Sequence, residues 1–292
     1  MSWYEALALG CVLSATDPVA VVALLKELGA SVHFNILVEG ESLLNDGTAM
    51  VFFLLFMSLV KGETTTAVSV ISSFVRLSIG GPLLGILAGL FLCWWMKKII
   101  RDTVLSIIIT FIITYLCFYI AEFTWVKVSG ILSIVTLGLF FSAVGKRKIY
   151  PESEHALHNV WSTIQYGSES LIFILTGIVV GIKMIDETTI TAGDWVKMFL
   201  FWILMIFSRV IMVLTFYPLL ARFGYGLTRK ELIVLIYGGL RGALGMCLSL
   251  FVAVDDSLRL RFRELTVFYM CGMAMLTIVV NGLTCSKLVG YL

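Results

Sequence analysis

The residues most able to do chemistry in this chain are carboxylates that lie inside long apolar segments. Asp17 belongs to the segment 14–18, which reads SATDP, and Asp46 follows about one helix later in the segment 41–47, which reads ESLLNDG. An ionised carboxylate in the middle of a bilayer costs about 2.5–3.5 kcal/mol on insertion scales, so a chain that keeps several there usually uses them. Carboxylates at that depth bind cations and protons, and cation transport coupled to protons is therefore the first hypothesis.

The composition predicts a protein that is integral to a lipid bilayer. Of the 292 residues, 60% are apolar and 14% are charged, against about 25% charged residues in ordinary soluble domains. The net charge of +2 gives no basic face for nucleic acid, so nucleic acid is not an expected partner. The six cysteines form no CxxC pattern and no cluster with histidine, and we expect neither a resident metal nor a cofactor.

Nine apolar runs reach or nearly reach the length that crosses a bilayer. They cover residues 3–27, 35–60, 68–96, 103–121, 125–144, 157–182, 195–220, 231–254 and 265–290. Only short polar loops separate them, and no linker or soluble domain interrupts them. The prediction is an all-α polytopic membrane protein with about nine transmembrane helices, in which residues 1–292 form a single membrane domain.

Two of these runs are expected to be broken in the middle. Pro18 has no N–H, so the carbonyl of Ser14 loses its helical partner, and Asp17 is pushed away from helical dihedral angles. In the eighth run the segment 238–245, which reads GGLRGALG, places four glycines around Arg241. Runs one and eight cross the membrane in opposite directions, and a pair of interrupted, antiparallel helices is typical of inverted-repeat secondary transporters with a site at the midplane.

Helical spacing places the polar residues of the second run. Ser42 and Asp46 are four residues apart and share a face, with Asn45 beside that face, whereas Glu41 is turned away from Asp46 by about 140°. Asp17 could converge with Asp46, and Na⁺ is a hard ion that prefers oxygen ligands of this kind. If Na⁺ and protons compete for one such site, the result is exchange and not co-transport. Two other functions stay open here: Asp17 could cap a half-helix, and Asn45 could brace the unwound backbone of the first run.

Three motifs carry a resemblance to a known family. They are the segments 15–21 (ATDPVAV), 39–49 (EGESLLNDGTA) and 239–243 (GLRGA). With them the chain resembles the monovalent cation:proton antiporters, the Na⁺/H⁺ exchangers. The segments 22–31 (VALLKELGAS) and 222–227 (RFGYGL) are most similar to the plant plasma-membrane salt-tolerance antiporters and the animal sperm-type exchangers. The resemblance covers essentially the whole chain.

The resemblance implies roles for the polar residues of runs one and two. Asp46 would be the main cation- and proton-binding carboxylate. Asp17, Ser42 and the carbonyl of Thr16 would complete the Na⁺ shell, so that Asp46 and Asp17 are the two acids in contact with the metal ion. Glu41 would act through water. Asn45, directly before Asp46, resembles the electroneutral branch of the family.

Three further charged residues are assigned by the same resemblance. Glu169 and Arg209 match a buried ion pair of the animal exchangers, and we expect that pair to be structural. Each lies in the middle of a predicted helix, where neither would be stable alone. For Arg241 two roles stay open: it balances charge where the broken helices cross, or it stabilises its own glycine-rich loop.

The chain also departs from the family, which has about thirteen spanning helices. This sequence has nine, and its first run corresponds to the fifth helix of the family, which is broken. The resemblance therefore implies an inverted-repeat antiporter fold that is N-terminally truncated, with a partial exchanger domain over residues 1–292. The expected function is exchange of Na⁺, or of Li⁺ or K⁺, for H⁺ in the plasma membrane, regulating pH and sodium, by a homodimer if the protein is complete. The alternative is a truncated, non-transporting membrane subunit that pairs with a full-length exchanger.

Other classes of function fit less well. A channel would use similar carboxylates without counter-ion coupling, and an intramembrane protease would need paired aspartates in a different sequence context. We therefore do not expect an enzyme. Glycines at every fourth position (Gly81, Gly85 and Gly89, and also Gly177 and Gly181) predict close packing between helices.

Overall fold

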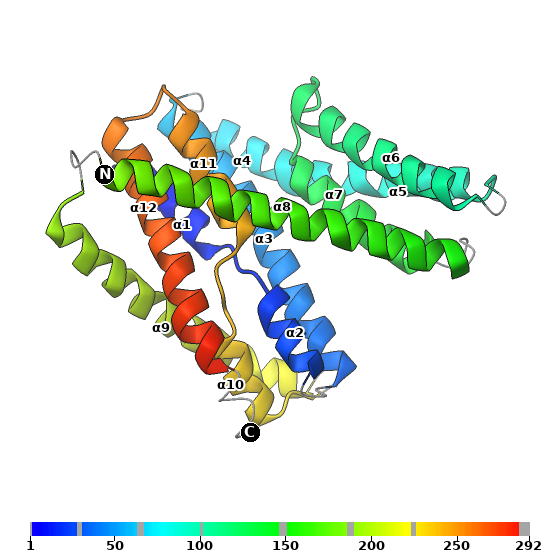
Figure 1. The fold of residues 1–292 in the computed structure, drawn as a ribbon. Helices are drawn as coiled ribbons and strands as arrows, with labels where there is room; N and C mark the ends of the chain where they lie inside the picture. The colour runs from blue at the N-terminus through cyan, green and yellow to red at the C-terminus, as the bar shows by residue number, and fades with distance from the viewer. Residues whose placement is uncertain are drawn as a thin grey trace. The chain divides into compact units, whose positions relative to one another are not determined.

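The computed structural model is built from helices (Figure 1) and describes residues 2–27, 31–62, 67–99, 102–145, 151–185, 190–222 and 226–285. Its α-helices are α1 (Trp3–Ser14), α2 (Val19–Glu27), α3 (Val32–Val60), α4 (Ala67–Val75), α5 (Gly81–Met96), α6 (Thr103–Phe123), α7 (Gly130–Phe140), α8 (Pro151–Ile185), α9 (Ala192–Arg222), α10 (Arg229–Tyr237), α11 (Ala243–Val254) and α12 (Leu260–Leu276). Three π-helical turns extend some of them: η1 (Arg76–Gly80), η2 (Phe141–Gly145) and η4 (Thr277–Gly282). The predicted all-α fold is confirmed. Residues 28–30 and 223–225, which belong to two of the segments that carry the resemblance, lie outside the described residues.

Five helical stretches are long and apolar enough to cross a bilayer, judged by length and composition within the described ranges. They are Val32–Val60, Val68–Met96, Thr103–Phe123, Ala192–Arg222 and Leu260–Cys285. The shorter apolar helices Trp3–Ser14, Gly130–Gly145 and Ala243–Val254 fall below that length. Two of these short helices belong to the runs that were predicted to be broken. The total of nine spans stays a prediction.

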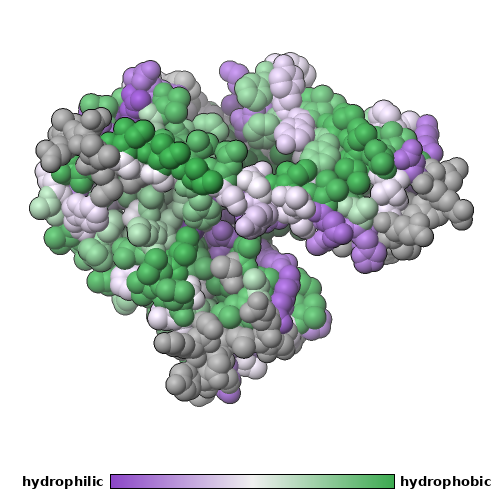
Figure 2. All heavy atoms as spheres, viewed as in Figure 1, coloured by the Kyte–Doolittle hydropathy of each residue, from purple (hydrophilic) through white to green (hydrophobic). Residues whose placement is uncertain are grey.

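The surface agrees with a bilayer environment. On α9, Val196, Ile203 and Phe207 expose more than half of their surface (69%, 56% and 60%), and similar side chains are exposed along α5, α6 and α8. Figure 2 shows hydrophobic side chains over large parts of the face turned to the viewer. Water-soluble proteins rarely expose apolar surface on this scale, whereas lipid tails accommodate it. The protein is therefore an integral membrane protein.

The chain divides into two compact units, and the boundaries between them fall inside α1, α3 and α8. The first unit comprises Leu9–Asp46 and Ile172–Leu292, and the second comprises Ser2–Ala8 and Gly47–Leu171. All residues of the predicted cation site belong to the first unit.

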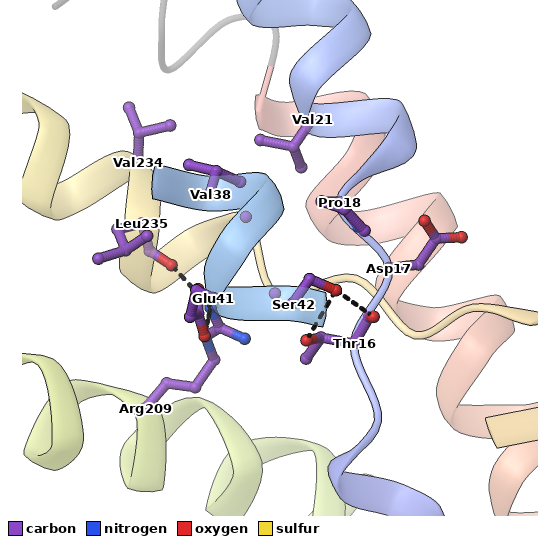
Figure 3. A pocket seen from close by; sticks show the side chains of 12 residues that line it. Thr16, Asp17, Pro18, Val21, Val38, Glu41, Ser42, Arg209, Val234 and Leu235 are labelled. Atoms are coloured by element: carbon purple, nitrogen blue, oxygen red, sulfur yellow. Dashed lines mark hydrogen bonds and ion pairs between the residues drawn. The ribbon is translucent and has the colours of Figure 1, made fainter. Parts of the chain in front are cut away.

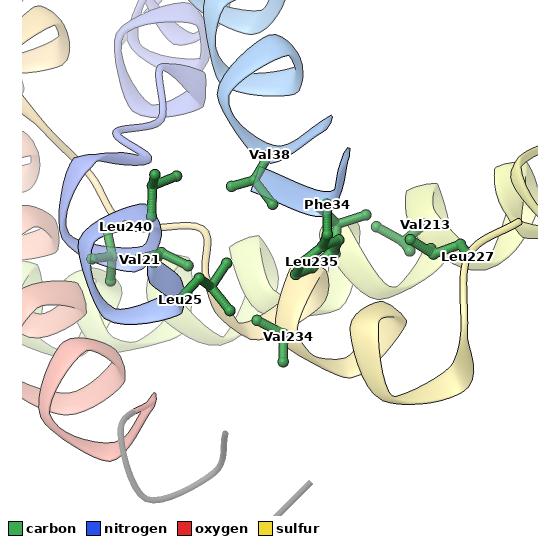
Figure 4. Close-up of a cluster of buried hydrophobic side chains, with 10 residues drawn as sticks. Val21, Leu25, Phe34, Val38, Val213, Leu227, Val234, Leu235 and Leu240 are labelled. Carbon is green, nitrogen blue, oxygen red and sulfur yellow. The ribbon is translucent and has the colours of Figure 1, made fainter. Parts of the chain in front are cut away.

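In the first unit, a hydrophobic cluster joins four helices. Val21 and Leu25 lie one turn apart on α2 and pack with Phe34 of α3, Val213 of α9 and Leu235 of α10 (Figure 4). Each of these side chains is at least 95% buried. Elsewhere in this unit α11 packs along α12, and α9 contacts both α10 and α12.

In the second unit, α5 and α7 pack closely because α5 is lined with glycine. A methyl group added to Gly85 would collide with the carbonyl oxygen of Ser133 on α7, and one added to Gly89 would meet the ring of Phe140. The predicted glycine packing is confirmed for this helix. On α8, no atom of the described residues lies within 4 Å of a methyl group added to Gly177 or Gly181, so close packing is not observed at this second pair.

Candidate functional site

The site lies where two interrupted helices meet. The first helical run stops at Ser14 and resumes at Val19, and the eighth stops at Tyr237 and resumes at Ala243. The backbone N–H of Asp17 donates a hydrogen bond to the carbonyl oxygen of Leu240 (2.9 Å), which makes a single antiparallel bridge between the two interruptions. Both predicted breaks are therefore confirmed, and they are joined through the main chain.

The carbonyl groups that the first break releases are satisfied by two side chains. The oxygen of Ser14 accepts from Nδ2 of Asn45 (3.0 Å) and from Nη1 of Arg241 (2.7 Å), and the same Nη1 donates to the oxygen of Ala15 (3.0 Å). Buried carbonyl groups need such partners, because an unpaired one costs about as much as a lost hydrogen bond. Arg241 is only 4% exposed and places its positive charge at the C-terminal end of α1. There it interacts favourably with the negative end of the helix dipole.

The glycines of the second break allow side chains to approach the backbone. A methyl group added to Gly239 would collide with the guanidinium group of Arg209, and one added to Gly242 would collide with the side chain of Asp17. Neither collision could be relieved by a small shift, since the neighbouring atoms belong to charged groups that are held in place by other contacts. The glycine-rich sequence is therefore required by the crossing itself.

Oxygen atoms from α3 and from the first break gather around Thr16. Oδ1 of Asp46 accepts from the backbone N–H of Thr16 (3.2 Å), and the hydroxyl of Ser42 donates to the carbonyl oxygen of Thr16 (2.5 Å). The hydroxyl of Thr16 lies 3.4 Å from Oγ of Ser42 and accepts from Nδ2 of Asn45 (3.0 Å). Figure 3 shows Ser42 and Thr16 pointing toward one another. A carboxylate, two hydroxyls and a carbonyl are ligand types that suit a hard monovalent cation.

Asp17 has a different position from the other members of the predicted shell. Its Oδ1 accepts a hydrogen bond from the backbone N–H of Val19 (2.9 Å), and in Figure 3 its side chain points away from Ser42 and Glu41. A carboxylate at this position caps the N-terminus of α2 and complements its dipole. The capping function left open for Asp17 is thus confirmed, and its role as a cation ligand stays a prediction.

Glu41 forms an ion pair with Arg209 of α9. Nη2 of Arg209 lies 3.0 Å from each carboxylate oxygen of Glu41 and 3.1 Å from the carbonyl oxygen of Leu235 (Figure 3). The sequence predicted Glu169 as the partner of this arginine. Glu169 belongs to the second unit, where it accepts a hydrogen bond from Gln165 (2.8 Å). Glu41 pairs with Arg209 because its side chain points away from Asp46 and toward α9, as its offset along the helix indicated.

A small pocket of the first unit opens beside these groups. Its polar lining includes Thr16, Asp17, Glu41, Ser42 and Arg209, and its apolar lining comes from α2, α3 and α10. Within the described ranges no group of three or more His, Cys, Asp or Glu side chains could hold a metal ion. The oxygen atoms beside Asp46 come from two hydroxyl groups and one carbonyl group. Such a mixed set is suited to an ion that is bound and released.

The pairing of Glu41 with Arg209 was not predicted from the sequence. Two signals pointed to it. Glu41 faces away from Asp46 yet lies within an apolar helix, and Arg209 is the one basic residue in the interior of its own run, between Lys197 and Arg222. Also missed was Thr277, whose hydroxyl oxygen accepts from the backbone N–H of Arg241 (3.2 Å). Nothing in the sequence around Thr277 marks it.

Comparison with known proteins identifies the family. The family model described as "Sodium/hydrogen exchanger, transmembrane" matches residues 1–290. The chain belongs to the sodium/hydrogen exchanger family. Sodium/hydrogen exchangers 7 and 8 of Arabidopsis thaliana are 41% and 40% identical to it over 97% of this chain. The predicted resemblance, including its plant-type character, is confirmed.

The fold of this sodium/hydrogen exchanger also has a solved counterpart. The sodium proton antiporter MjNhaP1 of Methanocaldococcus jannaschii superposes with a TM-score of 0.76 over 97% of this chain and 69% of its own, at 14% identity. That likeness shows that the two share the antiporter fold. The present chain spans 25% and 38% of the lengths of the two plant relatives.

Proposed function

We propose that this chain exchanges Na⁺, or Li⁺ or K⁺, for H⁺ across a membrane by secondary active antiport. One observation carries the proposal: Asp46 lies against the unwound backbone of the first break, where the hydroxyl of Ser42 and the carbonyl of Thr16 add oxygen atoms to its carboxylate. A carboxylate in this setting binds either a cation or a proton. Competition between the two ions at one group yields exchange without any covalent chemistry, so no enzymatic activity is proposed.

The proposed mechanism assigns a task to each residue. Asp46 binds the ion, while Ser42 and the Thr16 carbonyl share its coordination. Asn45 and Arg241 hold the freed carbonyls of the first break in place, so that the carbonyl groups do not need to move when the ion leaves. Asp17 keeps the N-terminus of α2 fixed through its Oδ1.

The division of the chain supports movement of the first unit as a body. That unit contains run one from Leu9 onward, the half of run two that ends at Asp46, and runs seven, eight and nine. We propose that this unit moves against a more static scaffold, with the bound ion or proton offsetting the charge of Asp46 during the movement. A homodimer in the plasma membrane, as in the expectation from the sequence, completes the proposal. No observation on the described residues favours the alternative of a non-transporting subunit.

The test is Na⁺-driven proton flux in proteoliposomes, followed with a pH-sensitive dye. Asp46→Asn keeps an oxygen for the Thr16 N–H but cannot exchange a proton for a cation, so we expect it to be expressed and inactive. Asp256→Asn is the matched control, because it removes an acid of the same kind from the α11–α12 loop, where the side chain is 91% exposed. Flux retained in Asp46→Asn would refute the assignment of the site, and no flux from the unaltered chain would refute exchange by this chain alone.

The dependence on pH gives a second readout. Because protons and Na⁺ compete for Asp46, the apparent KM for Na⁺ should rise as the pH falls, while the maximal rate at saturating Na⁺ changes less. A KM that is constant across the acidic range would contradict competition at a shared carboxylate.

A further inference from the structure

A second small cavity of the first unit lies beside the same two arginines. Its lining includes Trp202 and Arg209 of α9, Gly239 and Arg241 of the second break, and Thr277 and Asn281 of η4. It has room for about one water-sized molecule. Arg209 and Gly239 also line the first pocket, whereas Trp202, Thr277 and Asn281 line only this cavity.

Four residues of this lining each have one buried polar side-chain atom without a hydrogen-bond partner among the described residues. These atoms are Nε of Arg209, Nε of Arg241, Nε1 of Trp202 and Oδ1 of Asn281. Arg241 and Asn281 are 4% and 3% exposed. Buried polar atoms are nearly always paired, so four unpaired atoms in one cavity indicate a bound species.

The chemistry of these atoms limits what that species can be. A guanidinium Nε–H and an indole N–H can only donate, so three of the four atoms require an acceptor. A single water accepts two hydrogen bonds, whereas a halide ion accepts from all three donors at once. Asn281 supplies a fourth donor if its amide is turned over, at the loss of a long bond from Nδ2 to the carbonyl of Tyr237 (3.4 Å).

The charges around the cavity favour an anion as well. Arg209 has Glu41 as its counter-ion. Arg241 hydrogen-bonds to carbonyl oxygens, and no carboxylate of the described residues lies within ion-pair distance of it. Glu41 and Asp46 interact with Arg241 only at longer range. A buried cation without a contacting counter-ion is costly at membrane depth, and a small anion in this cavity removes that cost.

We propose that this cavity binds a single halide ion, chloride under ordinary conditions, through the Nε–H groups of Arg209 and Arg241 and the indole N–H of Trp202. The ion connects α9, the second break and η4, and it supplies the contacting negative charge for Arg241. The proposal is independent of the exchange activity, because none of the four unpaired atoms is hydrogen-bonded to the carboxylate of Asp46.

The test measures thermal unfolding of the purified full chain in detergent while sodium chloride replaces sodium gluconate at constant Na⁺ and ionic strength. A ligand that binds only the folded state raises the midpoint temperature by an amount that grows with its concentration. We therefore expect chloride, and also bromide, to raise the midpoint temperature over gluconate. Trp202→Phe keeps an aromatic ring but removes the donor, and it should require about tenfold more chloride for the same shift.

Trp195→Phe is the matched control, because Trp195 lies on the same helix, is 41% exposed and does not line the cavity. It should keep the chloride dependence of the wild type. Equal midpoint temperatures in gluconate and chloride would overturn the proposal and indicate that the cavity holds water. An equal chloride dependence of the two variants would show that the anion does not bind at Trp202, which also overturns the proposal. If Trp202→Phe does not fold, anomalous scattering from bromide in crystals of the unaltered chain decides: a peak between the two Nε atoms supports the proposal, and its absence refutes it.

Discussion

The ion pair of Glu41 and Arg209 allows the strongest test of the structure, because the sequence alone predicted a different partner. The perturbation is a double-mutant cycle of Glu41→Gln and Arg209→Gln. In the structure Nη2 of Arg209 contacts both oxygens of Glu41 and the carbonyl of Leu235, and the two side chains are 11% and 24% exposed. A parallel cycle with Glu169→Gln serves as the control, since Glu169 is the partner that family resemblance implied.

The magnitude follows from the burial of the pair. Removing one partner of a fully buried pair typically costs about 3–5 kcal/mol, because the other charge is left uncompensated. Glu41 retains about a quarter of its exposure, so each single substitution should cost about 3 kcal/mol, at the low end of that range. The double variant leaves no unpaired charge and should cost little more than one single variant, which gives a coupling energy of about 2–3 kcal/mol.

The assay is reversible unfolding of the purified chain in mixed micelles. Each cycle compares four proteins: the unaltered chain, the two single variants and the double variant. For Glu169 and Arg209 we expect a coupling energy below about 0.5 kcal/mol, because Glu41 already pairs with the guanidinium group of Arg209. A larger coupling energy for Glu169 than for Glu41 would refute the assignment of the ion pair.

Three other predictions follow from single contacts. Ser42→Ala removes an oxygen beside the Thr16 carbonyl. In the flux assay it should raise the KM for Na⁺ about tenfold, with expression unchanged. An unaltered KM would show that Ser42 does not coordinate the ion. Asn45→Ala deletes two hydrogen bonds and should lower the free energy of unfolding by about 2 kcal/mol, and a loss below about 0.5 kcal/mol would contradict its bracing role. Gly239→Ala should cost about 1–3 kcal/mol by overpacking, whereas Gly10→Ala, at an open position of α1, should be neutral or slightly stabilising; similar results for both would contradict the close approach at the second break.

The sequence was a good guide to those parts of the site that depend on local rules. Proline chemistry located the first break, since Pro18 cannot supply an N–H to Ser14, and glycine content located the second. The 3.6-residue period correctly grouped Ser42, Asn45 and Asp46 and turned Glu41 away from them.

The parts that the sequence did not predict depend on contacts between distant segments. Glu41 and Arg209 are 168 residues apart, and no local pattern states which acid an arginine in another helix will meet. Family resemblance proposed Glu169, whereas in the structure Arg209 contacts the carboxylate of Glu41. The orientation of the Asp17 side chain could not be predicted either. An aspartate before proline can cap the following helix or bind an ion, and which of the two occurs depends on where the backbone places the N–H of residue 19.

The bridge between Asp17 and Leu240 has a consequence for mutagenesis. Both of its atoms belong to the main chain, so exchanging either side chain for alanine leaves the bond available. Alanine scanning will therefore underestimate this contact, and the cost of replacing Leu240 will report the packing of its buried side chain and not the bond. Only a change that deletes the amide hydrogen, such as proline at position 17 or an ester in place of that amide, reports the strength of the bond directly.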